Sequence, residues 1–226
     1  MSSSWRVFWR EFRHSFHTTG AVAPSSAALG RALCRYLKPP PATPEQAALF
    51  PPRRVLEVGP GTGAVTRHIL RRLAPQDRLD LVEINPQFVQ FLQRRFRQDK
   101  RFAPYRQQVH LHQGSVLQWQ PPERYDVVIS GLPLNNFQPE QVQAFLDHFA
   151  RLAGPGGVVS FFEYVAVRST RQRLSRRVAT RQRLRGVSSV LRNYLRCYEL
   201  RRELVLRNLP PAWVHHLRFG EPAGDQ

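Results

Sequence analysis

The stretch Arg54-Val55-Leu56-Glu57-Val58-Gly59-Pro60-Gly61-Thr62-Gly63-Ala64-Val65-Thr66 decides the fold of this chain. Its apolar first part predicts a buried strand over 55–58. The three glycines that follow permit a tight turn and let a ligand approach the backbone without meeting a side chain. We expect Thr62 to cap a helix that continues over 67–73. In open α/β sheets, a turn of this kind at the carboxyl end of a strand is where nucleotides bind.

The acidic residues beside this turn indicate a cationic ligand. The glycine spacing also fits the dinucleotide pattern G-x-G-x-x-G/A, but Glu57 at the strand end would repel a pyrophosphate. That carboxylate suits S-adenosylmethionine (SAM), which carries a sulfonium and an ammonium group and no phosphate. A second predicted strand, 79–83, ends in Glu83, 20 residues after Gly63. A carboxylate at that place can accept hydrogen bonds from both ribose hydroxyls.

At these residues the chain resembles the class I SAM-dependent methyltransferases. The resemblance implies a Rossmann-like α/β fold, with a seven-stranded, mostly parallel sheet and a C-terminal antiparallel hairpin. It implies SAM as cofactor and S-adenosylhomocysteine as product. The family usually has Gly-Asp where this chain has Gly-Ser, so a hydroxyl or a backbone N–H would have to meet the adenine. The cofactor-binding residues implied are Glu57, Gly59, Pro60, Gly61, Thr62, Gly63, Glu83, Ile84, Gly114, Ser115, Val116 and Ser130.

The rest of the chain alternates between strand and helix patterns. With 226 residues, of which 42% are hydrophobic, it is long enough for one α/β domain with a substantial core. Alternation of this kind predicts a parallel sheet with right-handed crossovers. The predicted strands after residue 83 are 109–112, 125–130, 158–165, 203–207 and 213–219, the last two as a hairpin. The predicted helices are 27–37, 85–97, 139–152 and 168–202, the last with a weak break near Gly186.

The charge requires an anionic partner. The formal net charge is +18, and Lys38 and Lys100 are the only lysines among 34 basic residues. Nucleic acid and an acidic membrane surface are the two partners that such an excess suits. Two cysteines without a metal pattern or a disulfide framework fit a reducing cytosol. No run of 18 apolar residues occurs, so we expect no spanning helix.

The first residues predict an amphipathic helix on a membrane. One face carries five large aromatic side chains, and the other is basic. Such a helix lies in the interface of an anionic bilayer. The alternative is that its aromatic face packs on the protein core. We therefore expect residues 1–19 to bind membrane and 20–226 to form the methyltransferase domain. The aromatic residues are Trp5, Phe8, Trp9, Phe12 and Phe16.

An arginine-rich segment follows the predicted fifth strand. Residues 168–202 contain twelve arginines and a single acid, Glu199. Such a run is usually a solvated helix face, but this imbalance favours a surface that meets phosphate. The candidates for a lipid phosphate contact are Arg168, Arg177 and Arg181.

Two acceptor classes remain open from these residues. The glycine turn looks much like that of ribosomal RNA adenine dimethylases, and the basic charge suits RNA. Those enzymes carry N-[IL]-P-[YF] after the fourth strand, where the Asn holds the adenine amine and the aromatic ring stacks on the base. This chain has Gly131-Leu132-Pro133-Leu134 there, which lacks both groups.

Nearly the whole chain is similar to the bacterial peripheral-membrane phospholipid N-methyltransferases. The similarity lies in four segments: the aromatic and basic residues at the N-terminus, the loop over 19–26, residues 130–134 after the fourth strand, and the hairpin around 208–213. It implies phosphatidylethanolamine as acceptor, phosphatidylcholine as product, and a place on the inner face of the cytoplasmic membrane. It implies that the protein has no nucleic acid partner and no metal cofactor. The alternatives are another amino lipid such as an ornithine lipid, RNA adenine or another nucleic acid, a small-molecule or protein acceptor, or a SAM fold without activity. The catalytic candidates are Tyr164, Ser130 and Leu132, with Glu163 and His215 behind them.

Overall fold

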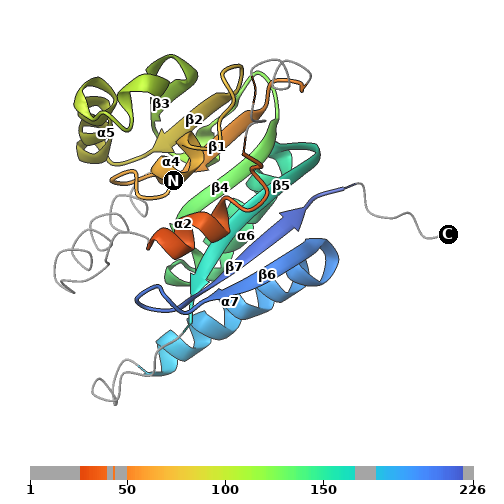
Figure 1. Cartoon of the computed structure of the whole chain (residues 1–226). Helices are drawn as coiled ribbons and strands as arrows, with labels where there is room; N and C mark the ends of the chain where they lie inside the picture. The colour runs from red at the N-terminus through yellow and green to blue at the C-terminus, as the bar shows by residue number, and fades with distance from the viewer. Residues whose placement is uncertain (1–25, 40–42, 44–49, 166–176, 221–226) are drawn as a thin grey trace.

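Seven strands form a single sheet in the order β3-β2-β1-β4-β5-β7-β6 (Figure 1). The computed structural model describes residues 26–39, 43, 50–165 and 177–220. Five strands are parallel, and β7 runs antiparallel to both β5 and β6. The predicted fold class is therefore confirmed. The strands are β1 Arg54–Val58, β2 Arg78–Glu83, β3 Val109–Gln113, β4 Tyr125–Pro133, β5 Ala153–Tyr164, β6 Glu199–Val205 and β7 Ala212–Arg218.

Helices cover both faces of the sheet and enclose two apolar cores. Side chains of α2, α4 and α5 pack in one core cluster, and side chains of α6 and α7 pack in the other. The helices are α2 Ala27–Leu33, α4 Thr66–Leu70, α5 Pro86–Gln98, α6 Pro139–Leu152 and α7 Arg177–Tyr198. Short 3-10 turns are η1 Ala103–Gln108, η2 Val116–Gln118 and η3 Leu134–Asn136. No helix of the described part is long and apolar enough to cross a membrane.

The sheet order places the glycine turn at a switch point. The chain leaves β1 towards β2 and β3 on one side, and returns to β4 and β5 on the other. Val58 pairs with Val82 in β2 and with Ser130 in β4, so these strands end at the same edge. In open α/β sheets, ligands bind in the crevice at such an edge.

Several predicted boundaries differ from those in the structure. Thr62 does not cap α4, which begins four residues later without a side-chain cap. β4 runs on to Pro133, so three residues placed after the strand belong to it. The predicted long helix ends at Tyr198, because residues 199–202 pair with β7 instead.

The predicted break at Gly186 is also absent, and α7 continues through it. A Cβ atom there would lie 2.5 Å from Cγ of Pro139 at the start of α6. The glycine therefore allows α7 to pack closely on α6, and tertiary contact outweighs its low helix propensity.

Candidate active site at the carboxyl edge of the sheet

The turn after β1 is closed on one side and open on the other. Gly59 and Gly61 have φ angles of 66° and 56°, in the left-handed region that glycine favours. A Cβ atom on Gly59 would lie 2.7 Å from Cδ2 of Leu132, whereas one on Gly61 would have no atom within 4 Å. The open side at Gly61 is a cradle in which a ligand can approach the backbone.

Glu83 joins the end of β2 to this turn. Its carboxylate is 3% exposed and accepts hydrogen bonds from the backbone N–H of Gly61 (3.0 Å) and of Asn85 (2.8 Å). Burial raises the pKa of Glu83, and these backbone donors oppose that shift. Since an ionised carboxylate has about four acceptor positions, the group retains capacity for the two hydroxyls of a ribose.

Glu57 is a fully buried carboxyl group without a hydrogen-bond partner. Its exposure is 0%, and neither oxygen has a partner of normal geometry among the described residues. Burial raises the pKa of Glu57 to about 8; the hydroxyl of Thr66 opposes this, and the charge of Glu83 adds to it. A cationic ligand group beside Glu57 would stabilise the carboxylate, and this fits the ammonium of SAM.

The remaining predicted cofactor residues gather at the same edge. The backbone N–H of Gly114, directly after β3, donates to the carbonyl oxygen of Glu83 (2.9 Å). Ser115 and Ile84 are half-buried, and Val116 is buried at the start of η2. Chain segments from three neighbouring strands therefore line one continuous edge (Figure 1).

Ser130 and Leu132 are buried supports of this edge. Ser130 is 0% exposed, and its Oγ accepts a hydrogen bond from the backbone N–H of Leu132 (3.3 Å). Leu132 is 7% exposed and packs on Gly59. Their proposed contact with the reacting groups stays a prediction, as does that of Tyr164.

A clamp that sequence reasoning missed holds Tyr164 to the loop after β4. The side-chain amide of Asn135 donates to the carbonyl oxygen of Tyr164 (2.7 Å), and its oxygen faces the backbone N–H of Tyr164 (3.4 Å). Arg183 in α7 donates to the carbonyl oxygens of Asn135 (2.9 Å) and Phe137 (3.2 Å). The loop, β5 and α7 are thereby fixed to one another beside the cofactor edge.

Gly131 has no room for a side chain. A Cβ atom there would lie 2.6 Å from the carbonyl oxygen of Gly59 and 3.3 Å from that of Val58. Leu134, where adenine methyltransferases carry an aromatic residue, is 0% exposed. The positions expected to hold and stack a base are therefore closed in this protein.

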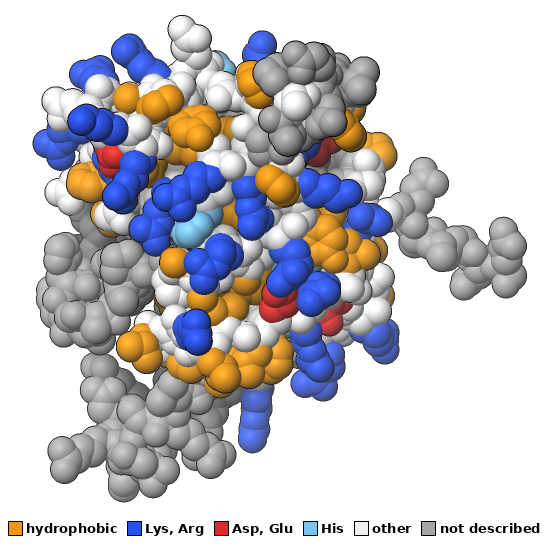
Figure 2. Space-filling model, viewed as in Figure 1, with side chains coloured by type: hydrophobic (Ala, Val, Ile, Leu, Met, Phe, Trp, Pro, Cys, Tyr) orange, Lys and Arg blue, Asp and Glu red, His pale blue; other side chains and the backbone are white. Residues whose placement is uncertain are grey.

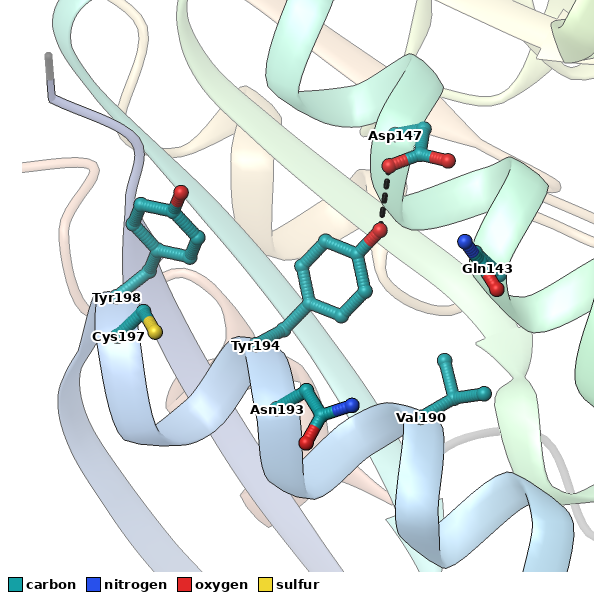
Figure 3. Close-up of a pocket in the computed structure, with 7 residues that line it drawn as sticks. All are labelled: Gln143, Asp147, Val190, Asn193, Tyr194, Cys197 and Tyr198. Atoms are coloured by element: carbon teal, nitrogen blue, oxygen red, sulfur yellow. Dashed lines mark hydrogen bonds between the residues drawn. The ribbon is translucent and has the colours of Figure 1, made fainter. Parts of the chain in front are cut away.

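A cavity of about 390 Å³ between α6 and α7 lies away from this edge, and there the Tyr194 hydroxyl donates to Asp147 of α6 (Figure 3). Tyr194 and Tyr198 also contact Phe219, the residue after β7. The end of β7 pairs with Val158, which lies towards the start of β5 and therefore away from the carboxyl edge. This cavity is not part of the cofactor site.

Several predicted contacts lie outside the described residues. These are the membrane helix over 1–19 and Arg168; Arg177 and Arg181 fall in the first turns of α7, where only the backbone is described. Among the described residues, no group of His, Cys, Asp and Glu side chains is arranged to hold a metal ion.

Comparisons with known proteins agree with this geometry. A family model described as a methyltransferase domain matches residues 55–157. An ornithine lipid N-methyltransferase from Singulisphaera acidiphila is 30% identical over 146 residues, which are 65% of this chain and 70% of that protein. The ribosomal RNA small subunit methyltransferase A of Gloeobacter violaceus is 39% identical over 82 residues, 36% of this chain and 26% of that protein.

Solved structures show the same fold. The O-methyltransferase TomG from Streptomyces achromogenes, solved in complex with SAM, superposes with a TM-score of 0.55 at 18% identity, covering 92% of this chain and 96% of that one. The alignment with the ornithine lipid enzyme covers more than two thirds of that protein, whereas the alignment with the ribosomal RNA enzyme covers about a quarter of its length. With its glycine turn, buried acids and strand order, the chain belongs to the class I SAM-dependent methyltransferases.

Proposed function

We propose that this methyltransferase transfers the SAM methyl group to the amine of a membrane amino lipid. The observation that carries the proposal is the closed loop after β4. Gly131 cannot carry a side chain, Leu134 is buried, and the amide of Asn135 is engaged by Tyr164. A flipped adenine needs hydrogen-bond partners and a stacking ring. A primary amine on a flexible headgroup needs only to be positioned and desolvated.

Two further observations support a lipid acceptor. The ornithine lipid N-methyltransferase aligns over 65% of this chain, whereas the RNA-modifying relative aligns over 36%. Figure 2 shows a face with many basic and few acidic side chains, which suits an anionic bilayer surface. Ornithine lipid and phosphatidylethanolamine are the two acceptors that we propose to test first.

For methyl transfer, the protein mainly has to position the acceptor amine against the SAM methyl group and exclude water from the site. When bound, SAM supplies an electrophilic methyl group on a sulfonium, a good leaving group. Glu57 offsets the positive charge of the ligand, and Glu83 fixes the ribose side. Burial of the acceptor disfavours its ammonium form and lowers the amine pKa, so the neutral nucleophile is available.

Tyr164 is the residue that we propose to lie beside the acceptor. Burial raises the pKa of its phenol, so the group is neutral near pH 7. It can accept or donate a hydrogen bond, but it does not serve as the base that removes the amine proton. Because Asn135 holds the backbone of Tyr164, the Tyr164 side chain has a fixed position as a lining residue of the proposed acceptor site.

An acceptor series tests the proposal. Purified full-length protein and SAM are incubated with vesicles that contain ornithine lipid, phosphatidylethanolamine or neither, and the lipids are analysed by mass spectrometry. We expect a mass increase of one or more methyl groups on an amino lipid and none on vesicles without one. Methylation of neither amino lipid, with SAM binding intact, would overturn the proposal.

A further inference from the structure

The loop that joins β6 to β7 exposes the two most solvent-accessible large apolar side chains of the described residues. Leu209 is 76% exposed and Leu206 is 68% exposed. We call residues 206–211 the hairpin tip. Figure 1 shows it projecting beyond the sheet, and Figure 2 shows hydrophobic and basic side chains beside one another in that region. Leucines exposed to this degree at one place mark an interaction surface.

The tip is braced from within, so the exposure of its leucines is built into the fold. Asn208 is 4% exposed, accepts a hydrogen bond from the backbone N–H of Ser26 (3.0 Å) and donates to the carbonyl oxygen of Pro210 (2.7 Å). The backbone N–H of Val165 donates to the carbonyl oxygen of Pro211 (2.7 Å). The polar side chain thus turns inward while its apolar neighbours turn outward, which reverses the usual arrangement of a surface loop.

The tip lies at the same edge of the sheet as the cofactor turn. Ala212 at the start of β7 pairs with Tyr164 at the end of β5 and with Val205 at the end of β6. A surface that the tip touches therefore also faces the carboxyl edge, where the proposed acceptor site lies.

One arginine belongs to the tip, and an acid of the adjoining strand β6 is already paired. Arg207 in the tip is exposed, as is Arg202 in β6, and the Arg202 guanidinium lies 5.3 Å from the ring centroid of Trp213, the second residue of β7. Glu203, by contrast, forms an ion pair with Arg35 of α2. Positive charge is thereby left around an apolar tip.

We infer that the hairpin tip docks on an anionic lipid bilayer. Leu206 and Leu209 enter the boundary between headgroups and acyl chains, and Arg207 and Arg202 meet lipid phosphates. Exposed leucines beside arginines suit a bilayer, which has a negatively charged surface above a fluid apolar layer. A protein partner would instead offer a pocket of fixed shape, so we favour the bilayer. The inference rests on the proposed function only for the identity of the methylated lipid, since docking itself is measured without methyl transfer.

Site-specific fluorescence tests the docking. In the full chain with Cys197→Ser, Leu209→Cys is labelled with an environment-sensitive nitrobenzoxadiazole probe; the other cysteine, Cys34, is buried. Leu200→Cys, 42% exposed at the far end of β6, is the matched control. With vesicles of phosphatidylcholine and phosphatidylglycerol, we expect the probe at 209 to brighten about twofold or more and the probe at 200 to stay unchanged. Equal responses at both positions would overturn the inference.

A second variant measures affinity for the membrane. Leu206→Ser with Leu209→Ser should weaken vesicle co-sedimentation by roughly tenfold or more, because each buried leucine contributes to binding. Leu200→Ser should change it less than twofold. A change of oligomeric state in the tip variant, with vesicle binding unaltered, would make the surface a protein interface and overturn the inference.

A soluble acceptor separates this inference from the proposed function. The tip variant should methylate a short-chain amino lipid below its micelle concentration as fast as the parent protein does. A parent protein that docks through the tip but methylates no amino lipid would refute the proposed function alone. Loss of activity on the soluble acceptor, with SAM binding intact, would show that the tip acts inside the acceptor site and would contradict a docking role.

Discussion

The two halves of the sheet use the same carboxyl edge in opposite ways. The cofactor half, β1 to β3, buries its carboxylates and offers backbone groups, with Glu57 and Glu83 almost fully enclosed. The C-terminal half, α7 with β6 and β7, exposes arginines and leucines and buries a polar asparagine. A ligand that is enclosed is recognised by a few desolvated groups, whereas a surface that is docked upon is recognised by many exposed ones. Variants in one half should therefore leave the other half's binding unchanged.

The largest expected effect is on SAM affinity in Glu83→Ala. Two backbone hydrogen bonds to a carboxylate are lost together with the predicted ribose contacts, so affinity should fall roughly a hundredfold or more. Vesicle binding should remain as in the parent. Isothermal titration calorimetry measures the first and co-sedimentation the second, with the exposed Glu123→Ala as matched control. Tight SAM binding by the Glu83 variant would refute the ribose assignment.

Glu57 should make SAM binding depend on pH. Because burial raises its pKa to about 8, the ligand-free protein holds this carboxyl mostly protonated at pH 6, and a cationic ligand must displace the proton. Affinity should therefore rise between pH 6 and pH 8, with proton release on binding. In Glu57→Gln, affinity should fall roughly tenfold and the pH dependence should disappear. Calorimetry at pH 6, 7 and 8 in two buffers measures both; an unchanged pH profile in the variant would exclude Glu57 as the cation partner.

The same shift predicts the stability of the ligand-free protein. The pKa of Glu57 is raised above its ordinary value of 4.5, so its contribution favours folding at low pH and is lost as pH rises from about 4.5 through 8. Glu57→Gln removes this penalty and should be more stable at pH 8, on the order of 1–4 kcal/mol. Urea unfolding at pH 5 and pH 8 measures the difference. Equal destabilisation at both pH values would contradict the assigned pKa.

A smaller effect is expected from Gly131→Asn, which restores the first residue of the adenine motif. Its Cβ would meet the carbonyl oxygen of Gly59 at 2.6 Å, so the turn must shift. We expect a loss of about 1–3 kcal/mol of stability and weaker SAM binding. Gly220→Ala, which has open space around its Cβ, serves as the control. Methylation of RNA adenine by Gly131→Asn at undiminished stability would show that the loop tolerates a base-binding residue.

An effect on kcat alone should come from Asn135→Ala. Loss of the clamp frees the loop from Tyr164, so kcat should fall about tenfold because positioning is lost. SAM affinity should stay within twofold, since Asn135 touches none of the cofactor residues by hydrogen bond. Asn136→Ala, its exposed neighbour, is the matched control. A fall in SAM affinity as large as the fall in kcat would assign Asn135 to the cofactor half instead.

Local patterns account for what the sequence could predict. Glu57, the glycines and Glu83 lie within one strand, one turn and the next strand, so their spacing alone predicts the cofactor edge. The clamp could not be predicted, because Asn135 and Tyr164 are 29 residues apart and Arg183 is 48 residues from Asn135. The tip is more remote still, since Asn208 is held by Ser26 across 182 residues. The predicted helix over 199–202 is wrong, because pairing with β7 outweighs the helix pattern of these residues.

The central claim is that the acceptor is a lipid amine, and a competition experiment tests it most directly. The protein and SAM carrying a labelled methyl group are mixed with anionic vesicles containing both amino lipids and with total RNA in the same tube. We predict that the label partitions into the chloroform phase, and that chromatography then identifies the methylated lipid. Label confined to the RNA would contradict the account and would mean that the arginines of the C-terminal half face a nucleic acid.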